Sequence, residues 1–227
     1  MLKHELRRFS PRRGFSDSHR TAILSAVSIM YRWRKMTDEQ RALELKRRQT
    51  ARKPLHSPAH YDAPTQVYLV SAACYEHRPH VGRSDQRMDG FAAALLAVAA
   101  GYCERVDAWV VLPNHYHILV CSGRILDLLK ALGKLHGKTA HAWNGEENSR
   151  GRKVWFNVLE RPIRTGRHHM ACIQYIHHNP VKHSHVRKWT DWKWSSAADY
   201  LARVGREEAE RRWREYPLHA FGRGWDD

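Results

Sequence analysis

Two histidines separated by one residue are the first candidates for chemistry. His115 and His117 lie inside the apolar stretch 107–123. In a β-strand, residues two positions apart share a face, so both imidazoles would project side by side while Tyr116 points the other way. Two imidazoles at this spacing can bind one divalent cation. Two buried, hydrogen-bonded histidines or a polar strand face would give the same pattern, so this pair alone does not identify a metal site.

A tyrosine and an asparagine near a proline are the second candidates. The residue before a proline disfavours helical geometry, so the sequence predicts a helix from about Arg167 to His178 that ends near Asn179, just before Pro180. Tyr175 and Asn179 are four residues apart, which places the phenol and the amide on one helical face. An amide oxygen is a suitable third ligand for a hard divalent cation, and the phenol would then lie close to the metal. The alternative is a tyrosine that only packs and an asparagine that only caps.

Basic side chains in two places are candidates for contacts with phosphates. One set steps by four along a predicted amphipathic helix, where a solvated helix surface is the alternative explanation. The other set directly precedes the tyrosine helix and is better placed to meet a phosphate near it. The first set is Lys130, Lys134 and Lys138, and the second is Arg161, Arg164 and Arg167.

The segments around these residues predict a mixed α+β fold. β-branched and aromatic residues favour strands, whereas Ala- and Leu-rich periodic stretches favour helices. The resulting order is strand, helix, two paired strands, helix, strand and helix, which predicts an antiparallel sheet with helices packed on one face. The predicted elements are strands at 66–75, within 107–123 and at 154–160, and helices at 89–106, 124–144 and 195–205.

The overall charge points to nucleic acid as a partner. Thirty-nine Lys and Arg residues against twenty-three Asp and Glu residues leave a formal net charge of +16 among 227 residues. Such a surplus repels itself unless a polyanion or an anionic membrane surface neutralises it. No apolar run approaches about 18 residues and the N-terminus does not resemble a signal peptide, so we expect a soluble, cytoplasmic, nucleoid-associated protein.

The four cysteines are expected to be reduced core residues. They are widely separated, form no Cys-x-x-Cys pair and lie in apolar stretches. A structural zinc site is the alternative, although no two of them have ligand spacing. They are Cys74, Cys103, Cys121 and Cys172.

Three motifs in one order resemble the REP-associated tyrosine transposases, which belong to the single-tyrosine His-hydrophobic-His (HUH) superfamily. The motifs are Leu112–His117, Tyr175–Lys182 and Trp192–Ser196, and the resemblance spans roughly residues 66–200. The chain departs from the family pattern after Val181, where a small, Gly-like residue is usual and this sequence reads Lys182-His183-Ser184-His185. This departure puts the local turn in question.

The resemblance implies a ferredoxin-like domain that cuts single-stranded DNA. His115, His117 and Asn179 would bind a divalent metal, Mg²⁺ or Mn²⁺, and Tyr175 would be the nucleophile that forms a 5′-phosphotyrosine. Palindromic REP repeats that fold as hairpins would be the substrate. A nucleic-acid-binding module without turnover and a replication-initiator-like nickase are the competing readings, and both a monomer and a homodimer fit the sequence.

The expected domain organisation has three parts. Residues 1–60 form a basic N-terminal extension with one helix, which begins with a capping box of Thr37 and Gln40, and a linker. Residues 61–200 form the catalytic domain, and residues 201–227 form a C-terminal tail.

Overall fold

The computed structural model describes residues 37–50, 67–218 and 221 of the chain, which divides into two compact units, 1–57 and 58–226. In the first unit the described part is helix α3 (Asp38–Thr50). Its capping box is confirmed, because the Thr37 amide donates to Gln40 Oε1 at 3.1 Å and the Gln40 amide donates to Thr37 Oγ1 at 3.3 Å. The remainder of the predicted 1–60 extension lies outside the described residues.

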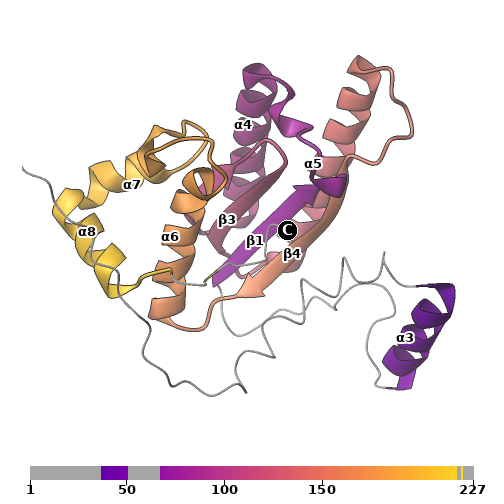
Figure 1. Cartoon of the computed structure of the whole chain (residues 1–227), viewed down its shortest axis with the longest axis horizontal. Helices are drawn as coiled ribbons and strands as arrows, with labels where there is room; N and C mark the ends of the chain where they lie inside the picture. Colours follow the sequence, from indigo (N-terminus) through magenta and orange to yellow (C-terminus); the bar gives the residue numbers. More distant parts are fainter. Residues whose placement is uncertain (1–36, 51–66, 219–220, 222–227) are drawn as a thin grey trace, which may run out of the picture. The chain divides into compact units, whose positions relative to one another are not determined.

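The second unit contains a four-stranded antiparallel sheet (Figure 1). Helix α4 (Asp85–Tyr102) connects its first two strands, and helix α5 (Ile125–Glu146) connects its last two. The strands lie side by side in the order β2-β3-β1-β4, so the first and third strands are central. This β-α-β-β-α-β order in an antiparallel sheet confirms the ferredoxin-like prediction. The strands are β1 (Val67–Cys74), β2 (Arg105–Val111), β3 (His115–Cys121) and β4 (Trp155–Pro162).

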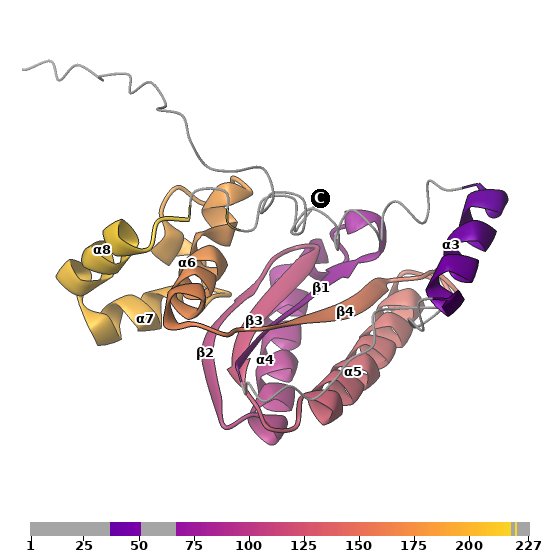
Figure 2. The same cartoon turned by 90° about the horizontal axis from the view of Figure 1, so that it is seen from below.

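Alternation along the central strands gives the sheet two apolar faces. On one face Tyr68, Val70 and Ile118 pack against α4 and α5, whereas Leu69 and Leu119 pack in a second cluster on the other face. Helices α4 and α5 therefore cover one face, as expected. The opposite face is covered by helix α6 (Gly166–Lys182), so the molecule has a third layer (Figure 2). No helix in the part of the chain that the structure describes is long and apolar enough to cross a bilayer.

Helix α6 continues past the position where the sequence predicted its end. It begins at its N-cap Thr165, whose side chain accepts from the His168 amide, and it includes Pro180. A proline costs a helix one backbone hydrogen bond and crowds the preceding turn. Here the loss falls in the last turn, where the His183 amide still donates to the Asn179 carbonyl at 3.0 Å. The expectation that the helix ends at Asn179 was therefore wrong by about one turn.

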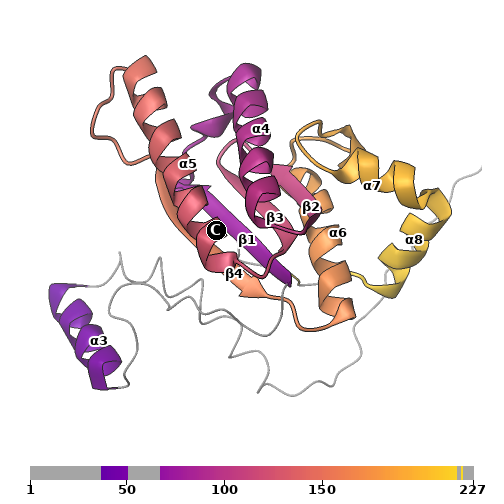
Figure 3. The ribbon, with the colours of Figure 1, turned by 180° about the vertical axis from the view of Figure 1, so that it is seen from behind.

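The C-terminal part adds two short helices on the α6 side of the sheet (Figure 3). The predicted helix at 195–205 is confirmed as α7 (Ala197–Val204), and Gly205, with φ of 81°, separates it from α8 (Arg206–Glu215). Helix α8 falls in the region predicted as a tail. The Gln174 side chain ties it to α6 by donating to the Arg212 carbonyl at 2.8 Å. Short 3₁₀ turns occur at Tyr75–His77, Val81–Arg83 and Trp189–Asp191.

The four cysteines are free thiols, in agreement with the sequence expectation. Cys74 and Cys172 are buried, and burial raises the pKa of both thiols to about 12, so they stay protonated at neutral pH. Cys103 and Cys121 are half-buried. Across residues 37–50, 67–218 and 221, no group of three or more His, Cys, Asp or Glu side chains is arranged to bind a metal ion.

The turn after α6, which the sequence comparison put in question, forms without a glycine. Ser184 has a φ of 59°, a left-handed conformation that costs an L-residue about 1–2 kcal/mol. The His185 amide donates to the Pro180 carbonyl at 2.9 Å and closes the turn.

Replacing Ser184 by glycine should therefore stabilise the protein. The expected gain in the free energy of unfolding is about 0.5–1 kcal/mol, because glycine adopts positive φ without steric cost. Urea denaturation followed by circular dichroism would measure it. Ser184→Ala is the matched control and should show no gain, and equal stability of the glycine and alanine variants would contradict this account.

Candidate active site

Strand β3 presents both histidines toward helix α6. His115 and His117 are each 3% exposed, and their ring centroids lie 5.1 Å apart. Tyr116 points to the opposite face, into the cluster under α4 and α5. The alternation predicted from the sequence is therefore confirmed.

Helix α6 brings the tyrosine and the asparagine to these imidazoles. The Tyr175 hydroxyl lies 3.3 Å from His117 Nε2, although the two residues are 58 positions apart in the chain. Asn179 Oδ1 lies 3.1 Å from His115 Nε2. Tyr175 and Asn179 are themselves 2% and 0% exposed. The four side chains thus form one buried cluster between the sheet and the helix.

The Nδ1 atoms of both histidines, which face away from Tyr175 and Asn179, contact polar neighbours. Ser71 Oγ lies 2.6 Å from His117 Nδ1, and Asn114 Oδ1 lies 2.7 Å from His115 Nδ1. Asn114 donates from Nδ2 to the His77 carbonyl at 3.1 Å, which leaves its oxygen facing His115. An amide oxygen only accepts, so a proton on His115 Nδ1 would be donated to Asn114 and the lone pair of Nε2 would then face α6.

This arrangement fits a divalent cation. With Nδ1 protonated, His115 Nε2 and Asn179 Oδ1 are two acceptors that face each other at 3.1 Å. Two ligands at right angles on a metal with bonds of about 2.1 Å are separated by about 3 Å. Histidine ligands also commonly donate their other ring N–H to an outer acceptor, as His115 would to Asn114. The residues suited to hold the ion are His115, His117 and Asn179.

Three more side chains border the tyrosine and the histidines. Lys182 Nζ lies 5.5 Å from the Tyr175 ring centroid, and the Phe221 ring lies 5.9 Å from it. The His183 ring contacts His115 at a centroid separation of 5.1 Å.

The two adjacent histidines of α6 do not reach this cluster. His177 is buried on another side of the helix, where its Nε2 lies 2.9 Å from Ser196 Oγ and its ring stacks on Trp189. Burial lowers the pKa of His177 to about 3, so it is neutral at pH 7. His178 is half-buried and packs against Trp213. Both residues serve to fasten α6 to the C-terminal helices.

The six basic residues expected to contact DNA fall on different faces of the molecule. The three lysines are exposed on α5, on the face of the sheet opposite Tyr175, and one of them forms a 3.6 Å ion pair with Asp127. The arginines lie toward the first turn of α6; Arg167, for example, is eight residues from Tyr175, or about 12 Å along the helix. Arg161 is half-buried beside Leu69 on the α6 face, whereas Arg164 and Arg167 are exposed. Neither set belongs to the histidine and tyrosine cluster.

Ser71 and Asn114 were missed by the sequence reasoning. Asn114 directly precedes the histidine pair and could have been found as an adjacent polar residue. Ser71 lies opposite His117 only because β1 pairs with β3 in a particular register. The register of this strand pair is a non-local property, and the residues around Ser71 in the sequence do not predict it.

Replacing Ser71 by alanine should weaken metal binding while leaving every proposed ligand in place. Loss of an outer hydrogen-bond partner typically costs about 10- to 100-fold in metal affinity, because the ligand ring loses its orientation and basicity. Titration with Mn²⁺ followed by calorimetry would measure the change. Ser122→Ala, which removes the hydroxyl of a buried serine outside the histidine and tyrosine cluster, is the control and should leave the affinity unchanged. An unaltered affinity in Ser71→Ala would contradict the assignment of His117 as a ligand.

Comparison with known proteins supports the same fold and the same resemblance. No family model matches the chain. A REP-associated tyrosine transposase of Escherichia coli K12 is 32% identical over 99 residues, which cover 43% of this chain and 57% of that protein. The match thus spans a little over half of the relative's length. A solved structure of a REP-associated tyrosine transposase bound to a REP hairpin aligns with a TM-score of 0.51 and 19% identity, over 64% of this chain and 84% of that one. The relative confirms the resemblance seen in the motifs, and the structural alignment confirms the fold.

Proposed function

We propose that this chain is a DNA transposase of the REP-associated tyrosine type, which cuts and rejoins single-stranded DNA at hairpin-forming repeats. The observation that carries the proposal is the contact of the Tyr175 hydroxyl with His117 Nε2 beside the His115 and Asn179 pair. The similarity to a REP-associated tyrosine transposase supports the class of reaction. The net charge of +16 suits a nucleic-acid substrate. Such a protein would act at the nucleoid, in the cytoplasm.

The proposed cofactor is Mg²⁺ or Mn²⁺, held by His115 Nε2, His117 Nε2 and Asn179 Oδ1. A divalent ion bound there would neutralise charge on a non-bridging phosphate oxygen and polarise the phosphorus. The carbonyl-type oxygen of Asn179 suits both ions, and the imidazoles favour Mn²⁺ over Mg²⁺.

Tyr175 is proposed to perform the chemical step. Its oxygen forms a bond to phosphorus while the bond from phosphorus to the 3′ oxygen breaks, and the 3′ oxygen takes up a proton. The products are a 5′-phosphotyrosine and a free 3′ hydroxyl, and the reverse reaction rejoins the strand. A phenol has an ordinary pKa near 10, so the proton must leave as the bond forms.

The competing function is a DNA-binding module without turnover. A basic surface would be sufficient for such a module. A module that only binds DNA would not need a phenol, two imidazoles and an amide to meet at one point between β3 and α6. This cluster favours the enzyme.

Incubation with labelled hairpin DNA tests the proposal. A single-stranded oligonucleotide that folds as a palindromic hairpin, together with Mg²⁺ or Mn²⁺, should give a covalent protein–DNA adduct on a denaturing gel, and EDTA should abolish it. Binding without an adduct would favour the module. An adduct formed equally well with strands that carry no hairpin would favour a replication-initiator-like nickase. Sedimentation of the DNA complex would distinguish a monomer from a homodimer.

A further inference from the structure

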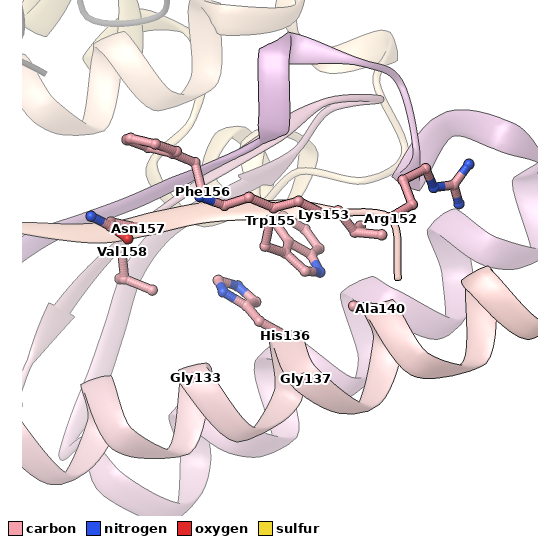
Figure 4. Close-up of a pocket in the computed structure, with 11 residues that line it drawn as sticks. Gly133, His136, Gly137, Ala140, Arg152, Lys153, Trp155, Phe156, Asn157 and Val158 are labelled. Atoms are coloured by element: carbon pink, nitrogen blue, oxygen red, sulfur yellow. The ribbon is translucent and has the colours of Figure 1, made fainter. Parts of the chain in front are cut away.

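A groove lies between α5 and the edge strand β4, on the face of the sheet opposite Tyr175 (Figure 4). Its volume is about 420 Å³, which is within the range of ligand sites. The helix side of the groove is flat because Gly133 and Gly137 are one turn apart and lack side chains. A Cβ built at either glycine meets no atom within 4 Å. The strand side is formed by Trp155 and Val158, which point toward the helix.

A polar group is directed into this apolar groove. His136 is only 6% exposed, and its ring lies parallel to Trp155 at 4.2 Å. Its Nε2 contacts the Tyr116 hydroxyl at 3.2 Å, which leaves Nδ1 to meet a ligand. Burial lowers the pKa of His136 to about 4, so the ring is neutral at pH 7 and Nδ1 can be a donor or an acceptor. A mostly apolar slot with a hydrogen-bonding group inside it suits a flat heteroaromatic ring.

Cations lie along the helix border of the groove. Lys134 and Lys138 each follow one of the two glycines and are exposed. On the strand side, the Lys153 side chain lines the groove, and its Nζ lies over the Tyr75 and Phe156 rings, at 4.8 Å and 5.2 Å from their centroids. A slot for a ring beside two exposed lysines is complementary to a nucleotide, whose base is flat and apolar and whose phosphates are anionic.

We propose that this groove binds an unpaired nucleotide of the DNA strand. The base would lie on the glycine surface of α5 with one edge at His136 Nδ1, and the flanking phosphates would meet Lys134 and Lys138. The inference rests on the proposed function for its ligand and adds a second contact site, remote from the scissile phosphate. The single-stranded tail of a hairpin would occupy it.

Filling the groove without disturbing the fold tests this proposal. In Gly137→Leu the new side chain enters open space, and leucine favours a helix more than glycine does. Gly90→Leu is the matched control, since Gly90 is an exposed glycine of α4 that also has no atom within 4 Å of a built Cβ. Affinities of the full chain would be measured by fluorescence anisotropy in EDTA, for a hairpin with a single-stranded tail and for the same hairpin without a tail.

Gly137→Leu should bind the tailed hairpin roughly 5- to 150-fold more weakly, which corresponds to the loss of one stacked base, and should bind the tailless hairpin normally. Gly90→Leu should match the wild type on both. Equal binding of the tailed hairpin by Gly137→Leu and the wild type would overturn this inference and leave the proposed function intact. A wild type that binds neither hairpin would overturn the proposed function as well. In a second measurement, 5-iododeoxyuridine in the tail should cross-link to the peptide that contains Trp155, and cross-links confined to other peptides would also overturn the inference.

Discussion

A variant with phenylalanine in place of Tyr175 is expected to form no covalent adduct and to cut hairpin DNA at least about 10³-fold more slowly. Removal of a nucleophile abolishes the covalent pathway and leaves only the contributions of binding and electrostatics. The substitution removes one hydroxyl and keeps the ring that packs against Phe221. The lost hydrogen bond to His117 costs about 1 kcal/mol, which is too little to unfold the protein. Adduct formation on a denaturing gel and the rate of strand cutting are the measurements.

Tyr200→Phe provides a matched control. Tyr200 is also buried in the cluster on the α6 face, and its hydroxyl also has a partner, Arg212 Nη1 at 3.2 Å. This variant should form the adduct at the normal rate. An adduct that persists in Tyr175→Phe would show that another residue is the nucleophile, and loss of the adduct in both variants would indicate a general effect on the fold.

Replacement of His117 by alanine is expected to lower the affinity for Mn²⁺ by more than about 100-fold and to reduce adduct formation in parallel. Loss of a hydrogen-bond partner of a ligand costs about 10- to 100-fold in metal affinity, and loss of the ligand itself should cost more. The effect of His117→Ala should therefore exceed that of Ser71→Ala. Calorimetric titration with Mn²⁺ measures the affinity independently of catalysis, and hairpin cutting at saturating Mn²⁺ shows whether the ion restores the rate.

The control for this experiment is His141→Ala. His141 is exposed on α5, on the opposite face of the sheet from the cluster. Its replacement should change neither the affinity for Mn²⁺ nor the formation of the adduct. DNA binding in EDTA should stay normal in His117→Ala, because the proposed DNA contacts lie elsewhere. Unchanged Mn²⁺ affinity in His117→Ala would show that the imidazole pair is only a buried hydrogen-bonded element, the alternative that the sequence left open.

Local periodicity was sufficient for much of the fold. Side chains alternate along a strand whatever lies around it, so the shared face of His115 and His117 could be predicted from the apolar pattern alone. The i, i+4 spacing placed Tyr175 and Asn179 on one face of a helix for the same reason. The capping box of Thr37 and Gln40 is also a short-range feature, because both partners lie within one turn.

Features that join distant segments were decided by tertiary structure. The contact between Ser71 and His117 depends on the β1 and β3 register, and the approach of Tyr175 to His117 depends on which face of the sheet α6 covers. The end of α6 beyond Pro180 depends on hydrogen bonds in the following turn. The tendency of a residue before proline to leave the helix, applied to Asn179 and Pro180, cannot predict those bonds. The groove between α5 and β4 exists because two helix glycines face an edge strand. In each case the stabilising contacts join groups that are far apart in the sequence, so a local sequence pattern cannot predict them.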